Sequence, residues 1–167
     1  MDPVEVGRKA LEYDKYSGCC QSVLLALQEA LGLGNEESFK AATVLAGGVA
    51  RRGETCGAVL GALMALGLAE GRERMENIED YRRALGLSQS LIEGIQRALQ
   101  ERFGFQKPLE STLCTDIQER IYGRSFDLTT QEGYQAFLDA GGHSDQGCPL
   151  VCAVAAEVAA RYIAGLG

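Results

Sequence analysis

Apolar residues recur at helical spacing along almost the whole chain, and this pattern constrains the fold more than any other feature. In residues 18–31 they form one helical face, made up of Val23, Leu24, Leu27, Ala30 and Leu31. Gly32 and Gly34 are suited to end this helix, because a left-handed residue commonly follows a helix C-terminus. No hairpin signal interrupts the series. The sequence therefore predicts an all-α fold, a compact single-domain bundle of six to eight helices over residues 1–167.

Cap and stop residues divide the rest of the chain. Asn35 is expected to cap a second helix, which Gly47 and Gly48 interrupt; its predicted inward residues are Phe39, Ala42, Thr43, Leu45 and Ala46. Further helices are predicted over residues 56–70, 81–102, 113–121, 130–138 and 148–164, with a loop at 140–147.

The segment at 56–70 carries an unusually small face, formed by Gly57, Ala58, Gly61, Ala62 and Ala65. Glycine inside a helix costs about 1 kcal/mol relative to alanine, so these glycines need a packing reason. We expect a closely packed central helix. The same face also suits a second subunit, so a homodimer is kept as an alternative.

The composition narrows the function classes. The 167 residues carry a net charge of −7, and no basic block is longer than two residues. Nucleic acids and anionic membrane surfaces need a concentrated basic face, so neither is expected as a partner. No apolar run approaches the roughly 20 residues of a membrane span, and no signal peptide is recognisable. We therefore expect a cytoplasmic protein, whose thiols are kept reduced.

The cysteines stand at or near predicted helix starts, and nearly every one follows a turn or cap residue. They are Cys19, Cys20, Cys56, Cys114, Cys148 and Cys152. A helix N-terminus presents unpaired N–H groups and the positive end of the dipole, which together lower the pKa of a thiol. The thiolate is the form that attacks, oxidises or binds metal. This repeated placement predicts a site built from thiolates.

Residues 56–61 read C-G-A-x-x-G, with Cys20 upstream and Cys114 and Cys148 downstream. In this ordered set the chain resembles the C_GCAxxG_C_C family of redox-active proteins, from about residue 17 to 163. The resemblance implies that Cys20, Cys56, Cys114 and Cys148 are redox thiols or metal ligands, and that Gly57, Ala58 and Gly61 contribute to a cofactor site. Cys19 and Cys152 are then extra cysteines of this chain.

Split-Soret cytochromes c, which carry an iron–sulfur centre and haem, are distantly similar to this family. Attachment of haem c is not expected here, because the chain has no C-x-x-C-H sequence and a single histidine, His143. A nucleotide cofactor is not expected either, because no phosphate-binding glycine loop occurs.

Three functions remain open at this stage. Four thiolates suit an iron–sulfur cluster or zinc, used for electron transfer or redox sensing with a redox partner protein. Pairs of cysteines can instead cycle between dithiol and disulfide without metal, as in a thiol–disulfide oxidoreductase. The third reading is a non-catalytic helical interaction module with buried structural cysteines.

Two further features lie close to the cysteines in the sequence. His143 stands five residues before Cys148 and is a candidate metal ligand, which Asp145 is placed to orient. Arg51 and Arg52 precede Cys56, where a cation offsets the charge of clustered thiolates.

Overall fold

The helices begin and end where the sequence supplies caps and stops. The computed structural model describes residues 1–167 and contains eight α-helices and a short 3-10 helix, η1 (Ala42–Leu45). The α-helices are α1 (Pro3–Asp14), α2 (Cys19–Leu31), α3 (Glu36–Ala41), α4 (Gly57–Glu70), α5 (Ile78–Phe103), α6 (Cys114–Tyr122), α7 (Gln131–Asp139) and α8 (Cys148–Ala164). The prediction of an all-α, single-domain fold is confirmed.

The second predicted helix is shorter than expected. Asn35 caps α3 with a capping box, in which its side chain accepts from the N–H of Ser38, but the α-helix ends at Ala41. Of the five residues predicted to face inward after this cap, only Ala42 is buried, and Thr43 is exposed. This prediction was therefore wrong in detail, because the chain tightens into η1 before the glycines.

Helix α1 is an element that the sequence reading did not include. Asp2 caps it by accepting from the N–H of Val4, and Pro3 occupies its first turn. Its inner face packs along α8, where a β-carbon at Gly7 would lie 2.7 Å from the carbonyl oxygen of Ala153. An Asp-Pro start followed by apolar residues at helical spacing was the available signal.

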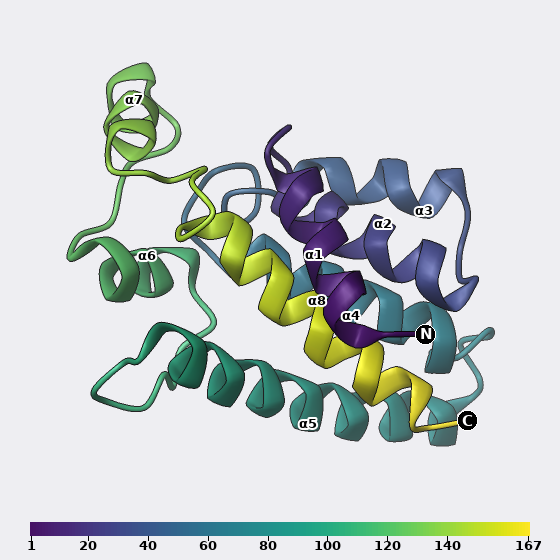
Figure 1. Ribbon diagram of the computed structural model, residues 1–167. Coiled ribbons are helices and arrows are strands. Elements are labelled where there is room, and N and C mark those ends of the chain that lie inside the picture. The colour runs from purple at the N-terminus through teal and green to yellow at the C-terminus, as the bar shows by residue number, and fades with distance from the viewer.

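Helix α8 runs through the middle of the bundle and contacts α1, α2, α4 and α5 (Figure 1). Its alanine-rich surface is buried over most of its length, which lets four neighbours approach it closely. Helix α4 is also closely packed, against α2, α5 and α8. None of the helices combines the length and the apolar character that crossing a bilayer requires.

Helices α6 and α7 belong to a smaller unit beside the main bundle. In Figure 1, α7 stands apart from the bundle, at the end where α8 begins. This part of the chain has its own apolar cluster, centred on Phe126, Leu128 and Phe137. The main core and this small cluster meet at the N-terminus of α8, and the candidate site lies there.

Candidate functional site

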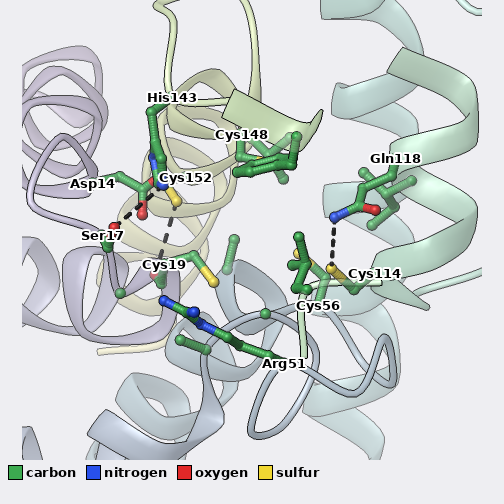
Figure 2. A pocket seen from close by; sticks show the side chains of 18 of the residues that line it. Asp14, Ser17, Cys19, Arg51, Cys56, Cys114, Gln118, His143, Cys148 and Cys152 are labelled. Atoms are coloured by element: carbon green, nitrogen blue, oxygen red, sulfur yellow. Dashed lines mark hydrogen bonds and ion pairs between the residues drawn. The ribbon is translucent and has the colours of Figure 1, made fainter. Parts of the chain in front are cut away.

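Three helices begin with a cysteine and a fourth, α4, has Cys56 as its N-cap; these four starts converge on one pocket (Figure 2). Five thiols line it, those of Cys19, Cys56, Cys114, Cys148 and Cys152. The space inside that a water-sized molecule can enter is about 80 Å³, several times what one water molecule needs. The fold therefore brings together cysteines that are up to 133 residues apart in the chain.

Cys20 does not line this pocket, which corrects the expectation that it converges with the other three thiols. Its side chain is fully buried in the main core, and its thiol lies 3.7 Å from the sulfur of Met64. Successive helical residues point about 100° apart, so only one residue of the Cys19–Cys20 pair faces the pocket. That residue is Cys19, which was predicted to be an extra cysteine.

Cys152 also lines the pocket, although the sequence reading treated it as an extra core cysteine. It lies one turn after Cys148 on α8 and is fully buried, with its thiol 3.8 Å from the carbonyl oxygen of Cys19. The i, i+4 spacing on a helix places both α8 thiols on the same face.

Residues of the C-G-A-x-x-G motif have two roles, lining the pocket and allowing a close contact between helices. Ala58 lines the pocket, whereas Gly57 and Gly61 face α2. A β-carbon at Gly57 would lie 2.3 Å from the sulfur of Cys19, and one at Gly61 would lie 2.4 Å from the carbonyl oxygen of Cys20. The glycines thus allow α2 and α4 to approach, which places Cys19 beside the pocket. The small face that suggested a second subunit is covered by α2 of the same chain.

A short backbone pairing holds Cys56 beside Cys114. The N–H groups of these two cysteines donate backbone hydrogen bonds of 2.8 and 2.7 Å across the pairing. They flank an isolated antiparallel bridge between Thr55 and Leu113. Because side chains alternate along a strand, Cys56 and Cys114 project from the same side of the bridge as diagonal neighbours.

Burial raises the pKa of all six thiols above the ordinary value for cysteine. This corrects the expectation that helix N-termini lower the pKa, because desolvation outweighs the helix dipole here. The charge of Cys56 contributes to the raised pKa of each of the other five thiols, so Cys56 is the electrostatic centre of the group.

Cys56 is also the thiol whose pKa is lowered in part by the N–H groups of its own helix start. The backbone N–H groups of Ala58 and Val59 lower its pKa, although burial raises it more. These groups belong to the first turn of α4, but no full capping hydrogen bond to the sulfur forms. A helix start therefore offsets part of the desolvation cost at this one sulfur.

Polar side chains contact two other pocket thiols. The amide of Gln118, only 2% exposed, donates to the sulfur of Cys114 at 3.6 Å. The hydroxyl of Tyr122 accepts from the N–H of Cys148 at 3.0 Å and lies 3.4 Å from its sulfur. Burial raises the pKa of Cys148 to about 12, and the hydrogen bond from Tyr122 lowers it in part. Both cysteines therefore have a polar neighbour at the sulfur.

A strained loop forms the rim next to Cys56. The five residues from Gly47 to Arg51 all have positive φ, between 51° and 70°, and three of them are not glycine. Such a run is costly for L-residues, and backbone hydrogen bonds at its end, including one of 2.9 Å from Glu54 to Gly48, hold it. The loop places the guanidinium of Arg51 4.4 Å from the ring centre of Tyr134 on α7.

His143 lies on the pocket wall, but its ring is directed toward other protein groups. Its Nε2 lies 3.3 Å from the hydroxyl of Ser17, and its Nδ1 lies 3.6 Å from a carboxylate oxygen of Asp14. Asp145, expected to orient this ring, instead forms an ion pair with Lys15 at 3.4 Å. The carboxylate beside the His143 ring is therefore that of Asp14 and not, as predicted, that of Asp145.

The donor atoms of the pocket fit a thiophilic metal in type and number. Asp14, 1% exposed, adds two carboxylate oxygens that have no hydrogen-bond partner. In the side-chain conformations of this structure, however, no three cysteine, histidine, aspartate or glutamate side chains lie close enough to hold one ion. Holding one ion would require several of these side chains to change their χ1 angles.

Comparison with protein families gives a match over residues 17–162, to the family described as "Putative redox-active protein (C_GCAxxG_C_C)". The chain belongs to this family. The matched segment contains every cysteine that lines the pocket, whereas Asp14, which also lines it, precedes the matched segment. Comparison with curated proteins and with solved structures gives no match.

Several pocket residues carried no signal in the reading of the C_GCAxxG_C_C sequence. Asp14 lies at the end of α1, Ser17 was predicted only as a turn residue ahead of Cys19, and Gln118 and Tyr134 lie on helices predicted without a facing direction. Their helical positions were accessible from the sequence. Their direction toward the pocket could not be predicted, because it depends on how distant segments of the chain pack together.

Proposed function

We propose that the thiol pocket is a redox centre, in which cysteine side chains hold an iron–sulfur cluster or another thiophilic metal ion. The ligands are Cys19, Cys56, Cys114 and Cys148, so Cys19 takes the role first given to Cys20. A cluster bound to four thiolates supplies one-electron transfer. The observation that carries the proposal is the convergence of four cysteine-bearing helix starts on one buried pocket.

The electrostatics of the pocket support a bound cation. Each of these thiols has a raised pKa, and the charge of Cys56 raises that of its neighbours. Ionising several of them together is therefore costly without a compensating positive charge. A metal provides this charge, and binding releases the thiol protons. The α2, α4, α6 and α8 N-termini add dipole ends that favour the resulting negative charge.

The test is anaerobic purification followed by metal analysis and a visible spectrum. We expect stoichiometric metal, with visible absorbance if iron and sulfide are bound, and loss of both in Cys56→Ser. The matched control is Cys20→Ala, which removes a buried thiol outside the pocket and should keep the metal. A protein that binds no metal after anaerobic reconstitution, or equal loss in both variants, contradicts the proposal.

The second candidate is metal-free dithiol–disulfide cycling between Cys56 and Cys114. The bridge between Thr55 and Leu113, which sets these thiols on one side as diagonal neighbours, favours it. In this reaction an incoming small-molecule disulfide accepts two electrons and the two thiol protons, leaving two small thiols and one protein disulfide. The raised pKa of Cys114 opposes fast exchange at neutral pH, so this candidate ranks second.

A thiol titration separates the two candidates. Disulfide cycling requires that mild oxidation removes two thiols per chain, and that peptide mapping finds them at Cys56 and Cys114. If all six thiols resist modification until the protein unfolds and no metal binds, the cysteines are structural and the chain is an interaction module. The redox partner, the homodimer and the cytoplasmic location stay predictions from the sequence.

A further inference from the structure

Three polar side chains form a line at the edge of the pocket that the redox proposal does not use. The hydroxyl of Ser17 lies 3.3 Å from Nε2 of His143, and Nδ1 of the same ring lies 3.6 Å from Oδ2 of Asp14 (Figure 2). The order is hydroxyl, imidazole, carboxylate, the order of a serine-hydrolase relay. Both distances are somewhat long, as is common for such relays before a substrate binds.

The buried end of this line has no other partner. Asp14 is 1% exposed, and neither of its carboxylate oxygens accepts a hydrogen bond. Nδ1 of His143 is also buried without a hydrogen-bond partner. Leaving such groups unpaired costs about 1–3 kcal/mol each, so a buried carboxylate kept beside an imidazole calls for a functional reason. With its proton on Nδ1, the ring presents Nε2 to the hydroxyl as an acceptor.

The other end of the line is accessible to solvent. Ser17 is exposed, in the turn between α1 and α2, with a positive φ of 67° that is rare for serine. It lies just ahead of α2, where Gly18 is the N-cap and no side chain caps the helix. The free N–H groups of that first turn are donors suited to a developing oxyanion.

We propose that Ser17, His143 and Asp14 form a second reactive site, an acyl-transfer centre that hydrolyses small uncharged esters. The oxygen of Ser17 bonds to the ester carbonyl carbon while its proton passes to Nε2 of His143. The carbon–oxygen bond to the alcohol then breaks, and the alcohol leaves with that proton. A water molecule releases the acid from Ser17 by the same transfers in reverse, and Asp14 stabilises the imidazolium in both steps.

The pocket behind Ser17 determines the class of ester. Part of its wall is apolar, with Leu128, Val151 and Phe137, the last of which packs edge-on against the ring of His143, and this suits an uncharged acyl chain. The carboxylate of Asp14 disfavours an acid group on that chain. The accessible space of about 80 Å³ limits it to a few carbons. Short-chain esters of acetic or butyric acid are therefore the expected substrates.

The test uses two probes on the reduced full-length protein, p-nitrophenyl butyrate and an alkyl fluorophosphonate, with mass spectrometry to locate the label. We expect the label on Ser17. We expect Ser17→Gly and His143→Gln each to reduce ester hydrolysis at least 100-fold, the lower end of what a general base contributes. Ser17→Gly suits the positive φ, so this variant should fold. The matched control is Ser144→Ala, an exposed serine next to His143 that should change neither readout.

Two results overturn the proposal. One is the absence of label on Ser17; the other is ester hydrolysis that persists in Ser17→Gly, which assigns the activity to another nucleophile. If His143→Gln loses its helical circular dichroism, Asp14→Asn replaces it as the relay variant. The acyl chain and a metal would share this one pocket, so the assay uses metal-free protein. Its readouts, label on Ser17 and ester hydrolysis, are separate from those of the redox proposal, which are bound metal and thiol count.

Discussion

The close approach of α2 and α4 at Gly61 gives the sharpest prediction about the fold. In Gly61→Ala the new β-carbon would lie 2.4 Å from the carbonyl oxygen of Cys20 and 3.2 Å from the backbone nitrogen of Leu24. Both are backbone atoms, so the helices must separate. Overpacking of this kind costs about 3 kcal/mol, the upper part of its usual range, and alanine returns about 1 kcal/mol of helix propensity. We therefore expect the free energy of unfolding to fall by about 2 kcal/mol.

The assay is urea unfolding of the reduced protein, followed by circular dichroism. Gly67→Ala is the matched control on the same helix, because a β-carbon there meets no atom within 4 Å. It should stabilise the protein by up to about 1 kcal/mol through propensity alone, so the two alanine variants should differ by about 3 kcal/mol. If Gly61→Ala is as stable as Gly67→Ala, the packing argument for the C-G-A-x-x-G motif is refuted.

Three other predictions concern charge, capping and strain. The pKa of Cys20 and of Cys148 is raised from 9.0 to about 12. As the pH rises, these thiols therefore lose their protons in the unfolded chain before they do so in the folded protein. The free energy of unfolding is unchanged below pH 9 and falls between pH 9 and pH 12, by about 1.4 kcal/mol per pH unit for each thiol. Urea midpoints measured from pH 8 to 11 check this, and a flat profile contradicts it. Asn35→Ala should lose about 1 kcal/mol of unfolding free energy with the capping box, whereas Asn77→Ala, at a start without a capping hydrogen bond, should lose little. Ala50→Gly should gain up to about 1 kcal/mol by relieving a φ of 51°. Ala41→Gly, where φ is −59°, should lose about as much, and the reverse order of the two unfolding midpoints would exclude strain in the loop.

Local signals in the sequence were sufficient to predict where most of the helices lie. The start of α8 at Cys148 and its end at Ala164 agree with the prediction, as does the stop of α5 before Gly104. Capping and periodicity act over a few residues, so a single sequence displays them. Helix α1, which was not predicted, also has such a local signal in its Asp2 cap and Pro3. The early end of α3 was a different case, because the left-handed loop that follows it is held by its own backbone hydrogen bonds and by the contact of Arg51 with Tyr134.

Only part of the candidate site could be predicted from such local signals. The sequence marked Cys56, Cys114 and Cys148, and the structure places all three on the pocket wall. The sequence could not show whether Cys19 or Cys20 faces the pocket, because this depends on the angle at which α2 packs against α4. The pKa direction was also wrong, since a helix start is visible in the sequence but the depth of burial is not.

The sequence by itself determined that this chain is helical, that cysteines stand at helix starts, and that glycines occur where helices must approach. These properties depend on the residue and its near neighbours. Only the tertiary structure decided which thiols share a pocket, that they stay protonated there, and that Asp14, His143 and Ser17 lie in line. Those properties depend on the packing of α1, α2, α4, α6 and α8 around one point, and desolvation and distance are set by that packing rather than by any local segment.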